Sequence, residues 1–331
     1  MTQDLQKTLY PFGLIDGRAV RVEGMGMPLH GPSAQYAITL FEGLIGYPVD
    51  GGIGIVALRE HFVRLLDGAS KGDLGFDRQG IETLVWQGME ALPALLRTNG
   101  VTGTVYIRPA LYHQGTGNVC LGPALEGDIH LGIYLQKWDG YLKRKPEGQR
   151  ILVSPYVKAA SPVAHLKCSA NYGLAIPAKR EACAQGYDEV IFLDAKRRVA
   201  EASSQNLIFD MEGGEDDPDG VLVTPSLTLE GRPAPILPGI TLRILRETIA
   251  PDLGLEIREE PIPYHEPFWA GCRGIGLCGT ATEIRHVGSI AMNWEERTFE
   301  RPSERLLALM DGYAKLTRGE AYREWLTIVP P

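Results

Sequence analysis

The chain has 331 residues, 44% of them hydrophobic, and a formal net charge of −8. This length is sufficient to bury a large core and is typical of about two domains. The acidic balance argues against nucleic acid as a main partner, because binding to a phosphate backbone needs a basic face. A small anionic substrate is not excluded, since a single local arginine can bind a carboxylate.

The cysteines and the N-terminus bear on the compartment. The five cysteines are odd in number and none of them forms a CxxC pair, so we expect neither a disulfide framework nor a zinc site. The first 13 residues contain no apolar run, which disfavours a signal or transit peptide. No segment approaches the roughly 20 apolar residues that span a membrane. We therefore expect a cytoplasmic protein without a membrane partner.

The first part of the chain mixes strand and helix patterns, with strands in the majority. An Asp-Gly pair at 16–17 predicts a hairpin, and residues 41–58 carry two strand-like runs around a glycine-rich turn. Residues 59–74 and 81–100 have apolar residues at helical spacing. Two further strands are predicted, at 101–113 and 128–138.

A charged stretch with Gly and Pro, at 137–150, is the best candidate for an interdomain link. After it the pattern predicts a strand, and then a loop followed by a helix within residues 165–186. More strands follow, including one continuous run over 199–211. Helices are predicted at 239–250 and 300–320, with strands between them.

Lys167 and Glu201 are the first candidates for chemistry. Lys167 lies among small and apolar residues, and burial of an ammonium is costly and favours the neutral, nucleophilic amine. Its neighbour Cys168 is better interpreted as a small buried residue than as a reactive thiol. Glu201 follows an apolar strand-like run, where a carboxylate can face a site at the end of a strand. Taken singly, each residue is more often an ordinary surface residue.

Two turns of small residues are candidates for phosphate binding. LPGIT at 237–241 joins a glycine to the first turn of a helix, whose free N–H groups suit an anion. CGTATE at 278–283 is a second turn with hydroxyl groups. Neither is a Walker or Rossmann fingerprint, which argues against a nucleotide cofactor. His61 and Arg64 lie one helical turn apart, but without a third ligand we expect no metal site.

Eight motifs occur in a particular order along the chain. They are LFEG at 40–43, REHFVRL at 59–65, YIRP at 106–109, LKCSANY at 166–172, GYDEVIFLD at 186–194, VAEASSQNLIF at 199–209, LPGIT at 237–241 and GTATEI at 279–284. In these motifs and their order, from about residue 15 to the last helix, the chain resembles the class IV, or branched-chain amino acid, aminotransferases, which are fold type IV pyridoxal-phosphate enzymes.

The resemblance implies pyridoxal 5'-phosphate as the cofactor. Lys167 matches the catalytic lysine that holds it as a Schiff base and moves the substrate proton. Glu201 matches the carboxylate that pairs with the pyridine nitrogen, which strengthens the ring as an electron sink. Tyr172 matches the residue that hydrogen-bonds the phenolic oxygen of the cofactor. An arginine fork together with the free N–H groups of a turn is suited to binding the cofactor phosphate. The phosphate group is then held by Arg64, Gly239, Ile240, Thr241, Gly279 and Thr280.

The resemblance also implies a substrate pocket and a fold. Substrate-binding positions are Tyr36, Phe41, Gly43, Tyr106, Arg108, Trp138, Tyr141 and Ala281. In the family, the YIRP tyrosine grips the α-carboxylate and the YIRP arginine helps to receive the distal carboxylate of glutamate. The implied fold is α/β (α+β): a small N-terminal α/β domain (1–137), an interdomain loop (138–149) and a larger β-rich pseudo-barrel domain (150–331), with the cofactor between them. Such enzymes are homodimers or larger homo-oligomers.

The resemblance therefore predicts transamination of an aliphatic, branched-chain-like L-amino acid with 2-oxoglutarate as acceptor. Four departures from the family pattern put the substrate in question: Ile45, Asn118, Cys120 and Gln205. An aminotransferase for an amine, a D-amino acid or a dedicated biosynthetic substrate is one alternative, and an aminodeoxychorismate-type lyase is another. A non-catalytic binding protein of the same fold is the alternative from a different class.

Overall fold

The computed structural model describes residues 8–76, 79–115, 128–213 and 220–331, so that Asn118 and Cys120 lie outside the described residues. The chain divides into two compact units. Unit 1 comprises Met1–Asp139, Leu166–Ala170 and Leu316–Pro331; unit 2 comprises Gly140–His165 and Asn171–Lys315. The expected domains were consecutive in sequence, whereas unit 1 also takes in two later segments.

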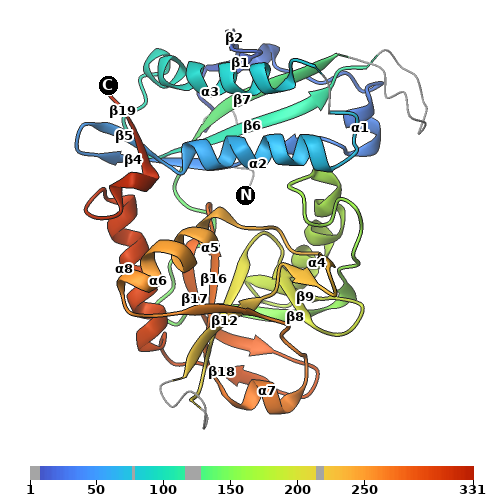
Figure 1. The fold of residues 1–331 in the computed structure, drawn as a ribbon, viewed down its shortest axis with the longest axis vertical. Helices are drawn as coiled ribbons and strands as arrows, with labels where there is room; N and C mark the ends of the chain where they lie inside the picture. Colours follow the sequence, from blue (N-terminus) through green and yellow to red (C-terminus); the bar gives the residue numbers. More distant parts are fainter. Residues whose placement is uncertain (1–7, 77–78, 116–127, 214–219) are drawn as a thin grey trace. The chain divides into compact units, whose positions relative to one another are not determined.

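Unit 1 is built on an eight-stranded sheet with the order β19-β5-β4-β6-β7-β1-β2, and β3 pairs with β6. Its described strand pairs are antiparallel, and the C-terminal strand β19, red in Figure 1, lies beside the blue strand β5. The strands are β1 (Phe12–Ile15), β2 (Arg18–Arg21), β3 (Leu40–Phe41), β4 (Leu44–Val49), β5 (Gly52–Val56), β6 (Val105–His113), β7 (Ile129–Lys137) and β19 (Leu326–Val329).

The predicted hairpins of unit 1 are confirmed. Ile15 pairs with Arg18 across the turn, and Asp16 and Gly17 have φ values of 51° and 75°. Asp and Gly tolerate this left-handed backbone, and the resulting turn matches the twist of the two strands. Strands β4 and β5 also form a hairpin, in which Val49 pairs with Gly52 across Asp50 and Gly51.

Beside this sheet, the described residues form the α-helices α1 (Pro32–Tyr36), α2 (Leu58–Lys71) and α3 (Ile81–Thr98). The two long helices lie where helical spacing predicted them. Helix α3 packs on β1 and β7, and α2 packs on α3 and β3. Leu58, Phe62 and Leu65 of α2 are buried, because their spacing places them on one helical face.

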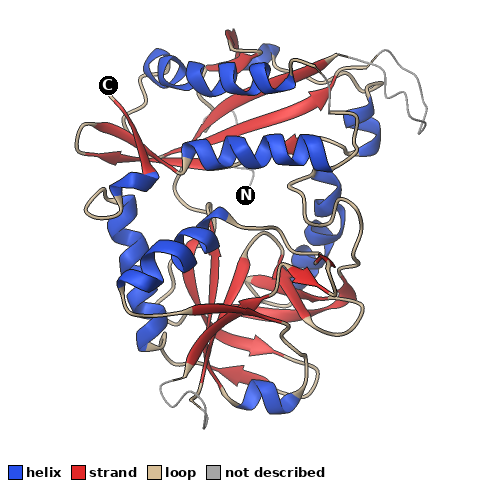
Figure 2. Ribbon diagram, viewed as in Figure 1, coloured by secondary structure: helices blue, strands red, loops and turns tan. Residues whose placement is uncertain are grey.

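Unit 2 is mainly strand, as Figure 2 shows. Its nine-stranded sheet has the order β10-β9-β8-β17-β16-β11-β12-β15, with β18 beside β17. The strands are β8 (Gln149–Val157), β9 (Glu189–Leu193), β10 (Val199–Ala202), β11 (Asn206–Met211), β12 (Val221–Pro225), β15 (Ile257–Glu260), β16 (Cys272–Gly279), β17 (Glu283–Ala291) and β18 (Glu296–Thr298).

The helices of unit 2 connect or cover these strands. Strands β8 and β9 are parallel and need a crossover, which α4 provides while packing on both. Residues Ile240–Asp252 form one continuous helical stretch with a π-helical middle. The helices are α4 (Tyr172–Ala184), α5 (Ile240–Ile244), α6 (Ala250–Asp252), α7 (Glu266–Ala270) and α8 (Glu304–Thr317), whose last two residues belong to unit 1.

The single strand predicted over 199–211 was wrong. The segment divides into β10 and β11, which pair with β9 and β16, respectively. A tight turn separates them, because the Ala202 N–H donates to the Gln205 carbonyl at 2.9 Å. The polar residues of this turn interrupt the apolar run, and the two halves find different partners.

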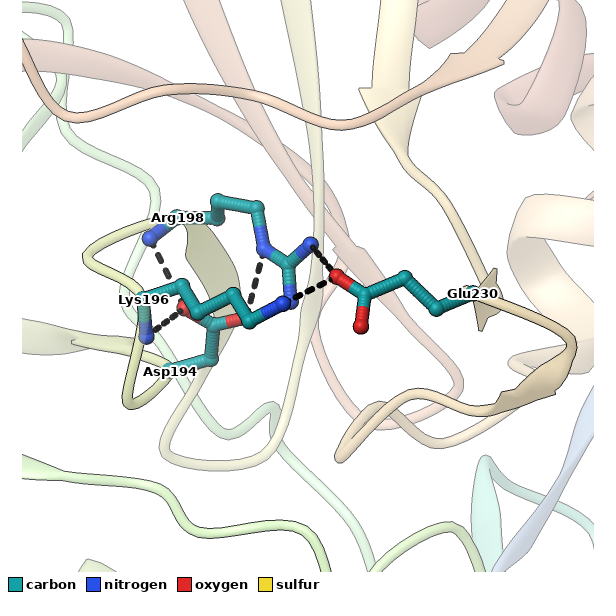
Figure 3. A network of polar contacts seen from close by, with 4 residues as sticks. All are labelled: Asp194, Lys196, Arg198 and Glu230. Carbon is teal, nitrogen blue, oxygen red and sulfur yellow. Dashed lines mark hydrogen bonds and ion pairs between the residues drawn. The ribbon is translucent and has the colours of Figure 1, made fainter.

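A small hairpin of β13 (Thr228–Leu229) and β14 (Arg232–Pro233) precedes the LPGIT segment. Figure 3 shows the polar network that ties it to the β9–β10 turn: Asp194 binds Arg198 at 2.7 Å, and both Lys196 and Arg198 contact Glu230. The exposed Lys196–Glu230 pair adds little stability, whereas the Asp194 carboxylate is buried. Below them, Ala200 packs in a small apolar cluster with residues at 234 and 236. The hairpin therefore fixes the approach of the chain to Leu237.

In the described ranges, no helix has both the length and the apolar character needed to cross a membrane.

Candidate active site

Lys167 lies on unit 1, in the short segment Leu166–Ala170. Two backbone hydrogen bonds hold this segment: Phe41 N–H donates to the Lys167 carbonyl at 3.0 Å, and Ser169 N–H donates to the Thr39 carbonyl at 2.9 Å. The next residue, Cys168, is fully buried, and burial raises the pKa of its thiol. Its interpretation as a buried residue is confirmed, and Lys167 has a fixed backbone.

The Phe41 ring is close to two cations. Lys167 Nζ lies 5.1 Å from the ring centroid, and the Arg108 guanidinium carbon lies 4.4 Å from it. Arg108 is also 5.1 Å from the Tyr106 ring. An aromatic face attracts cations through its quadrupole, so Phe41 stabilises two positive groups within one small region.

Gly43 allows Tyr106 to occupy its position. A Cβ on Gly43 would lie 2.2 Å from the Tyr106 hydroxyl oxygen, so any side chain here would displace that hydroxyl. Tyr106 also stacks on Trp138, with ring centroids 4.9 Å apart. Ile45, one of the departures, is buried and pairs directly with Tyr106 across β4 and β6.

Arg64 is held by Glu42, which the sequence had not singled out. Arg64 Nε donates to Glu42 Oε1 and Arg64 Nη2 donates to Glu42 Oε2, both at 2.7 Å. His61 Nδ1 is also 2.7 Å from Glu42 Oε2. The Glu42 and His61 side chains are each 1% exposed. Arg64, Glu42 and His61 thus form a buried cluster on unit 1.

The pKa values of this cluster are shifted. Burial alone would raise the pKa of Glu42, but Arg64 and His61 beside it more than compensate and lower that pKa far below its usual range. Burial lowers the pKa of His61, with Arg64 and Lys167 adding to the effect and Glu42 opposing it. At neutral pH the cluster therefore contains a carboxylate, a guanidinium and a neutral imidazole.

The stability of the protein is expected to fall as the pH decreases below about 6.5. His61 titrates near 6.5 once unfolded but at lower pH when folded, so the unfolded state binds more protons in this window and gains stability from acid. Denaturant unfolding of wild type and His61→Gln between pH 7.5 and 5 measures the effect. The variant should be less stable at pH 7.5 but have a shallower pH dependence; an unchanged slope would contradict the assignment.

Glu201 lies on unit 2, at 8% exposure on β10. One of its oxygens contacts Lys158 Nζ, and the other accepts the Leu237 N–H at 2.8 Å. Lys158 follows β8, and its own N–H donates to the Leu193 carbonyl. The buried Glu201 carboxylate is therefore held by one contact to each of its oxygens, on the edge strand β10.

Three turns of unit 2 meet near Glu201. The Asn206 side chain donates to the Leu237 carbonyl at 2.9 Å, and a Cβ on Gly239 would lie 1.9 Å from Asn206 Oδ1. The departure Gln205 donates to Thr282 Oγ1 at 3.1 Å. The two turns proposed for phosphate, at 237–241 and 279–282, are thus both attached to the turn that follows Glu201.

The predicted site residues divide between the two units. The Tyr141 hydroxyl is 2.9 Å from Lys179 Nζ, which also binds the buried Glu189 at 2.7 Å. On unit 1 are Tyr36, Phe41, Gly43, Arg64, Tyr106, Arg108, Trp138 and Lys167. On unit 2 are Tyr141, Tyr172, Glu201, Gly239, Ile240, Thr241, Gly279, Thr280 and Ala281.

Sequence reasoning missed four residues that hold predicted site residues in place: Glu42, His61, Lys158 and Asn206. Glu42 and Asn206 stand inside quoted motifs, and His61 was considered only as a metal ligand. Their position next to an expected site residue was the available signal. Lys158 had no such signal, because 43 residues separate it from Glu201.

Comparison with known proteins agrees with this arrangement. The family model for amino-transferase class IV matches residues 39–290. A branched-chain-amino-acid aminotransferase of Salmonella typhimurium is 30% identical over 284 residues, which is 83% of each chain. Another from Aquifex aeolicus, named as probable, is 29% identical over 96% of each chain.

Solved structures are similar over nearly the whole chain. The branched-chain aminotransferase of Thermoproteus uzoniensis with norvaline has a TM-score of 0.82 and 28% identity, covering 96% of this chain and 99% of that one. The T.th. branched-chain amino acid aminotransferase complexed with N-(5'-phosphopyridoxyl)-L-glutamate has a TM-score of 0.80 and 26% identity, covering 97% and 99%.

This chain belongs to the class IV aminotransferases. The resemblance stated from the motifs is confirmed, and so is the predicted fold type IV class, with its β-rich second part. The protein is therefore an enzyme of the aminotransferase class.

Proposed function

We propose that this enzyme uses pyridoxal 5'-phosphate to transfer the amino group of a branched-chain L-amino acid to 2-oxoglutarate. The observation that carries the proposal is the fixed Lys167, held by Phe41 and accompanied by Arg108 within 4.4 Å of the same ring. The names of the relatives above support the donor class. The intact YIRP motif, with Arg108 beside Tyr106, supports a dicarboxylic acceptor.

The residues present fit the cofactor. Glu201 is a buried carboxylate, which suits a protonated pyridine nitrogen, and Tyr172 begins α4. A Cβ on Gly239 would lie 1.9 Å from Asn206 Oδ1, so a side chain there would displace the Asn206 amide. The first turn of the helix that begins at Ile240 has free N–H groups, which suit an anion. When bound, the cofactor supplies an electron sink for the carbanion formed at the substrate Cα.

The roles of the chain's own residues follow. Lys167 binds the cofactor covalently through Nζ and moves a proton at the substrate Cα. Glu201 holds the proton of the pyridine nitrogen by its charge. Arg64, with the backbone N–H groups of Gly239 to Thr241 and the Gly279–Thr280 turn, binds the phosphate. These assignments rest on the motif matches and the local geometry described above.

The substrate side is proposed mainly from residues of unit 1, with Ala281 and Tyr141 from unit 2. Tyr106 grips the α-carboxylate, together with the Ala281 backbone, and Arg108 receives the distal carboxylate of the acceptor. Tyr36, Phe41, Gly43, Trp138 and Tyr141 surround the substrate side chain. We further propose that the protein is cytoplasmic. We also propose that it is a homodimer or larger homo-oligomer, and sedimentation of the purified holoenzyme tests this oligomeric state.

A second candidate, an aminotransferase with an atypical donor, is favoured by Ile45. This apolar side chain is 1% exposed and pairs with Tyr106 at a position where branched-chain enzymes typically carry a basic residue. A D-amino acid, a chiral amine or a dedicated biosynthetic substrate are the donors to compare. Nothing in the described residues favours a lyase over a transferase.

The test is a product assay with purified holoenzyme, 2-oxoglutarate and one donor at a time. When L-leucine is the donor, the two products should appear in equal amounts: L-glutamate and 4-methyl-2-oxopentanoate. With D-alanine or a simple chiral amine, turnover should be at least about tenfold slower. If D-alanine or the chiral amine is turned over faster than L-leucine, that compound replaces the proposed donor. If no donor is turned over, the proposed function is refuted.

Arg108→Ala is expected to slow the half-reaction with L-glutamate about tenfold more than that with L-leucine. Only glutamate has a distal carboxylate, and one charge-assisted hydrogen bond to it is lost. Single-turnover rates with each donor measure the ratio. Arg21→Ala is the matched control, because Arg21 also lies over an aromatic ring, that of Phe12 at 5.3 Å, but on the surface of unit 1. Equal losses on both donors would contradict the role of Arg108.

A further inference from the structure

The fully buried carboxylate of Glu42 binds the Arg64 guanidinium. Glu42 lies between β3 and β4, and its two oxygens accept two parallel hydrogen bonds from the Arg64 guanidinium at 2.7 Å. This fork arrangement fixes the plane of the guanidinium as well as its position. The arginine side chain is 15% exposed, whereas that of Glu42 is only 1% exposed. The pair therefore has a buried, fixed end and a more accessible arginine.

His61 completes the cluster from the same helix as Arg64. The two residues are three positions apart on α2, which places them side by side on one helical face. Since a carboxylate only accepts hydrogen bonds, His61 Nδ1 donates its proton to Glu42 Oε2 at 2.7 Å. The other ring nitrogen, Nε2, is buried without a hydrogen-bond partner among the described residues. The single N–H of this neutral ring is therefore directed to Glu42.

The burial of these groups is costly. Desolvation of an ion pair often exceeds its Coulombic gain, so that an apolar replacement of the same shape would serve stability equally well. A buried ring nitrogen without a partner adds a further cost. The observations are better accounted for by a role in orientation than by a role in stability.

We infer that Glu42 and His61 are positioning residues, which hold the Arg64 guanidinium in the orientation that receives the cofactor phosphate. The inference rests on the proposed function, in which Arg64 binds that phosphate. Glu42 acts on Arg64 directly, and His61 acts through Glu42. Neither residue is assigned a contact with the cofactor or the substrate.

The experiment compares the affinities of pyridoxal phosphate and pyridoxal, which differ only in the phosphate. The full-length chain, freed of cofactor, is titrated with each compound, and visible absorbance reports binding. The ratio of the two dissociation constants isolates the phosphate contacts, because general damage to the site weakens both compounds equally. Glu42→Asp keeps the charge but shortens its reach, and His61→Gln removes the imidazole. Glu90→Asp, on the exposed face of α3, is the matched control.

In wild type and Glu90→Asp the phosphate compound should bind much more tightly. The ratio should fall about tenfold in Glu42→Asp, which corresponds to one charge-assisted hydrogen bond, and by a smaller factor in His61→Gln. Arg64→Ala should reduce it at least as far as Glu42→Asp.

The outcomes separate the two claims. If Arg64→Ala reduces the ratio but Glu42→Asp does not, the positioning inference is overturned while the phosphate role of Arg64 stands. If Arg64→Ala leaves the ratio unchanged, the phosphate role fails and the inference fails with it. Should Glu42→Asp be too unstable to titrate, His61→Gln carries the test, and a wild-type ratio in that variant overturns the inference.

Discussion

Lys167→Ala is expected to lower transamination on the order of a thousandfold and to abolish covalent attachment of the cofactor. The amine is the proposed covalent link and also the group that moves the proton at the substrate Cα, so one substitution removes both functions. The fold should persist, because the backbone hydrogen bonds of the 166–170 segment to Thr39 and Phe41 do not involve the Lys167 side chain.

Borohydride reduction followed by peptide mass spectrometry measures the attachment. In the wild-type protein, the cofactor mass should stay on the peptide that contains Lys167. The variant should retain no cofactor mass after denaturation. Attachment of the cofactor to a different lysine, or turnover of the variant near the wild-type rate, would refute the assignment.

Glu201→Gln is expected to lower the rate of the half-reaction on the order of a hundredfold, with a smaller change in cofactor affinity. Glutamine keeps the shape and can still accept the Leu237 N–H, but it lacks the charge that holds a proton on the pyridine nitrogen. Single-turnover kinetics with L-leucine measure the rate, and the absorption spectrum of the bound cofactor reports the protonation of its ring.

Unit 2 offers a matched control for this variant in Glu189→Gln. Glu189 is also a buried carboxylate, bound by Lys179 at 2.7 Å and by the Val190 N–H at 2.9 Å. Both substitutions remove one buried charge beside a lysine and should lower the free energy of unfolding similarly. Only Glu201→Gln should change the spectrum of the cofactor. An equal loss of rate in both variants would mean that Glu201 acts through stability alone.

Local patterns in the sequence predicted most of unit 1. The Asp16-Gly17 turn, the β4–β5 hairpin and helices α2 and α3 depend on neighbours within a few residues, which periodicity and turn chemistry report well. The return of β19 to pair with β5 was not predictable in this way. It joins segments about 270 residues apart, and no local pattern encodes such a pairing.

The sequence predicted the candidate site residues, but it did not predict the residues that hold them in place. Motif matches identified Lys167, Arg64 and Glu201 as candidates, but not the groups that fix their orientation. The contact of Glu42 with Arg64 requires β3 and α2 to be placed together, and the contact of Lys158 with Glu201 requires β8 and β10 to lie in one sheet. Both are tertiary contacts between segments that are distant in sequence, and local motifs do not predict such contacts.

Ile45 and Gln205 illustrate what the structure adds to a departure from a family pattern. Both are buried, and each contacts an expected site element: Ile45 pairs with Tyr106, and Gln205 binds Thr282 of the GTATEI turn. The structure therefore places both departures beside expected site elements.

The most direct test of the central claim is the visible absorption spectrum of the full-length holoenzyme during addition of L-leucine. The account predicts a visible cofactor band that is lost with L-leucine and restored by 2-oxoglutarate, in proportion to the enzyme present. A band that L-leucine leaves unchanged, but that D-alanine or a chiral amine removes, would contradict the proposed branched-chain L-amino acid substrate.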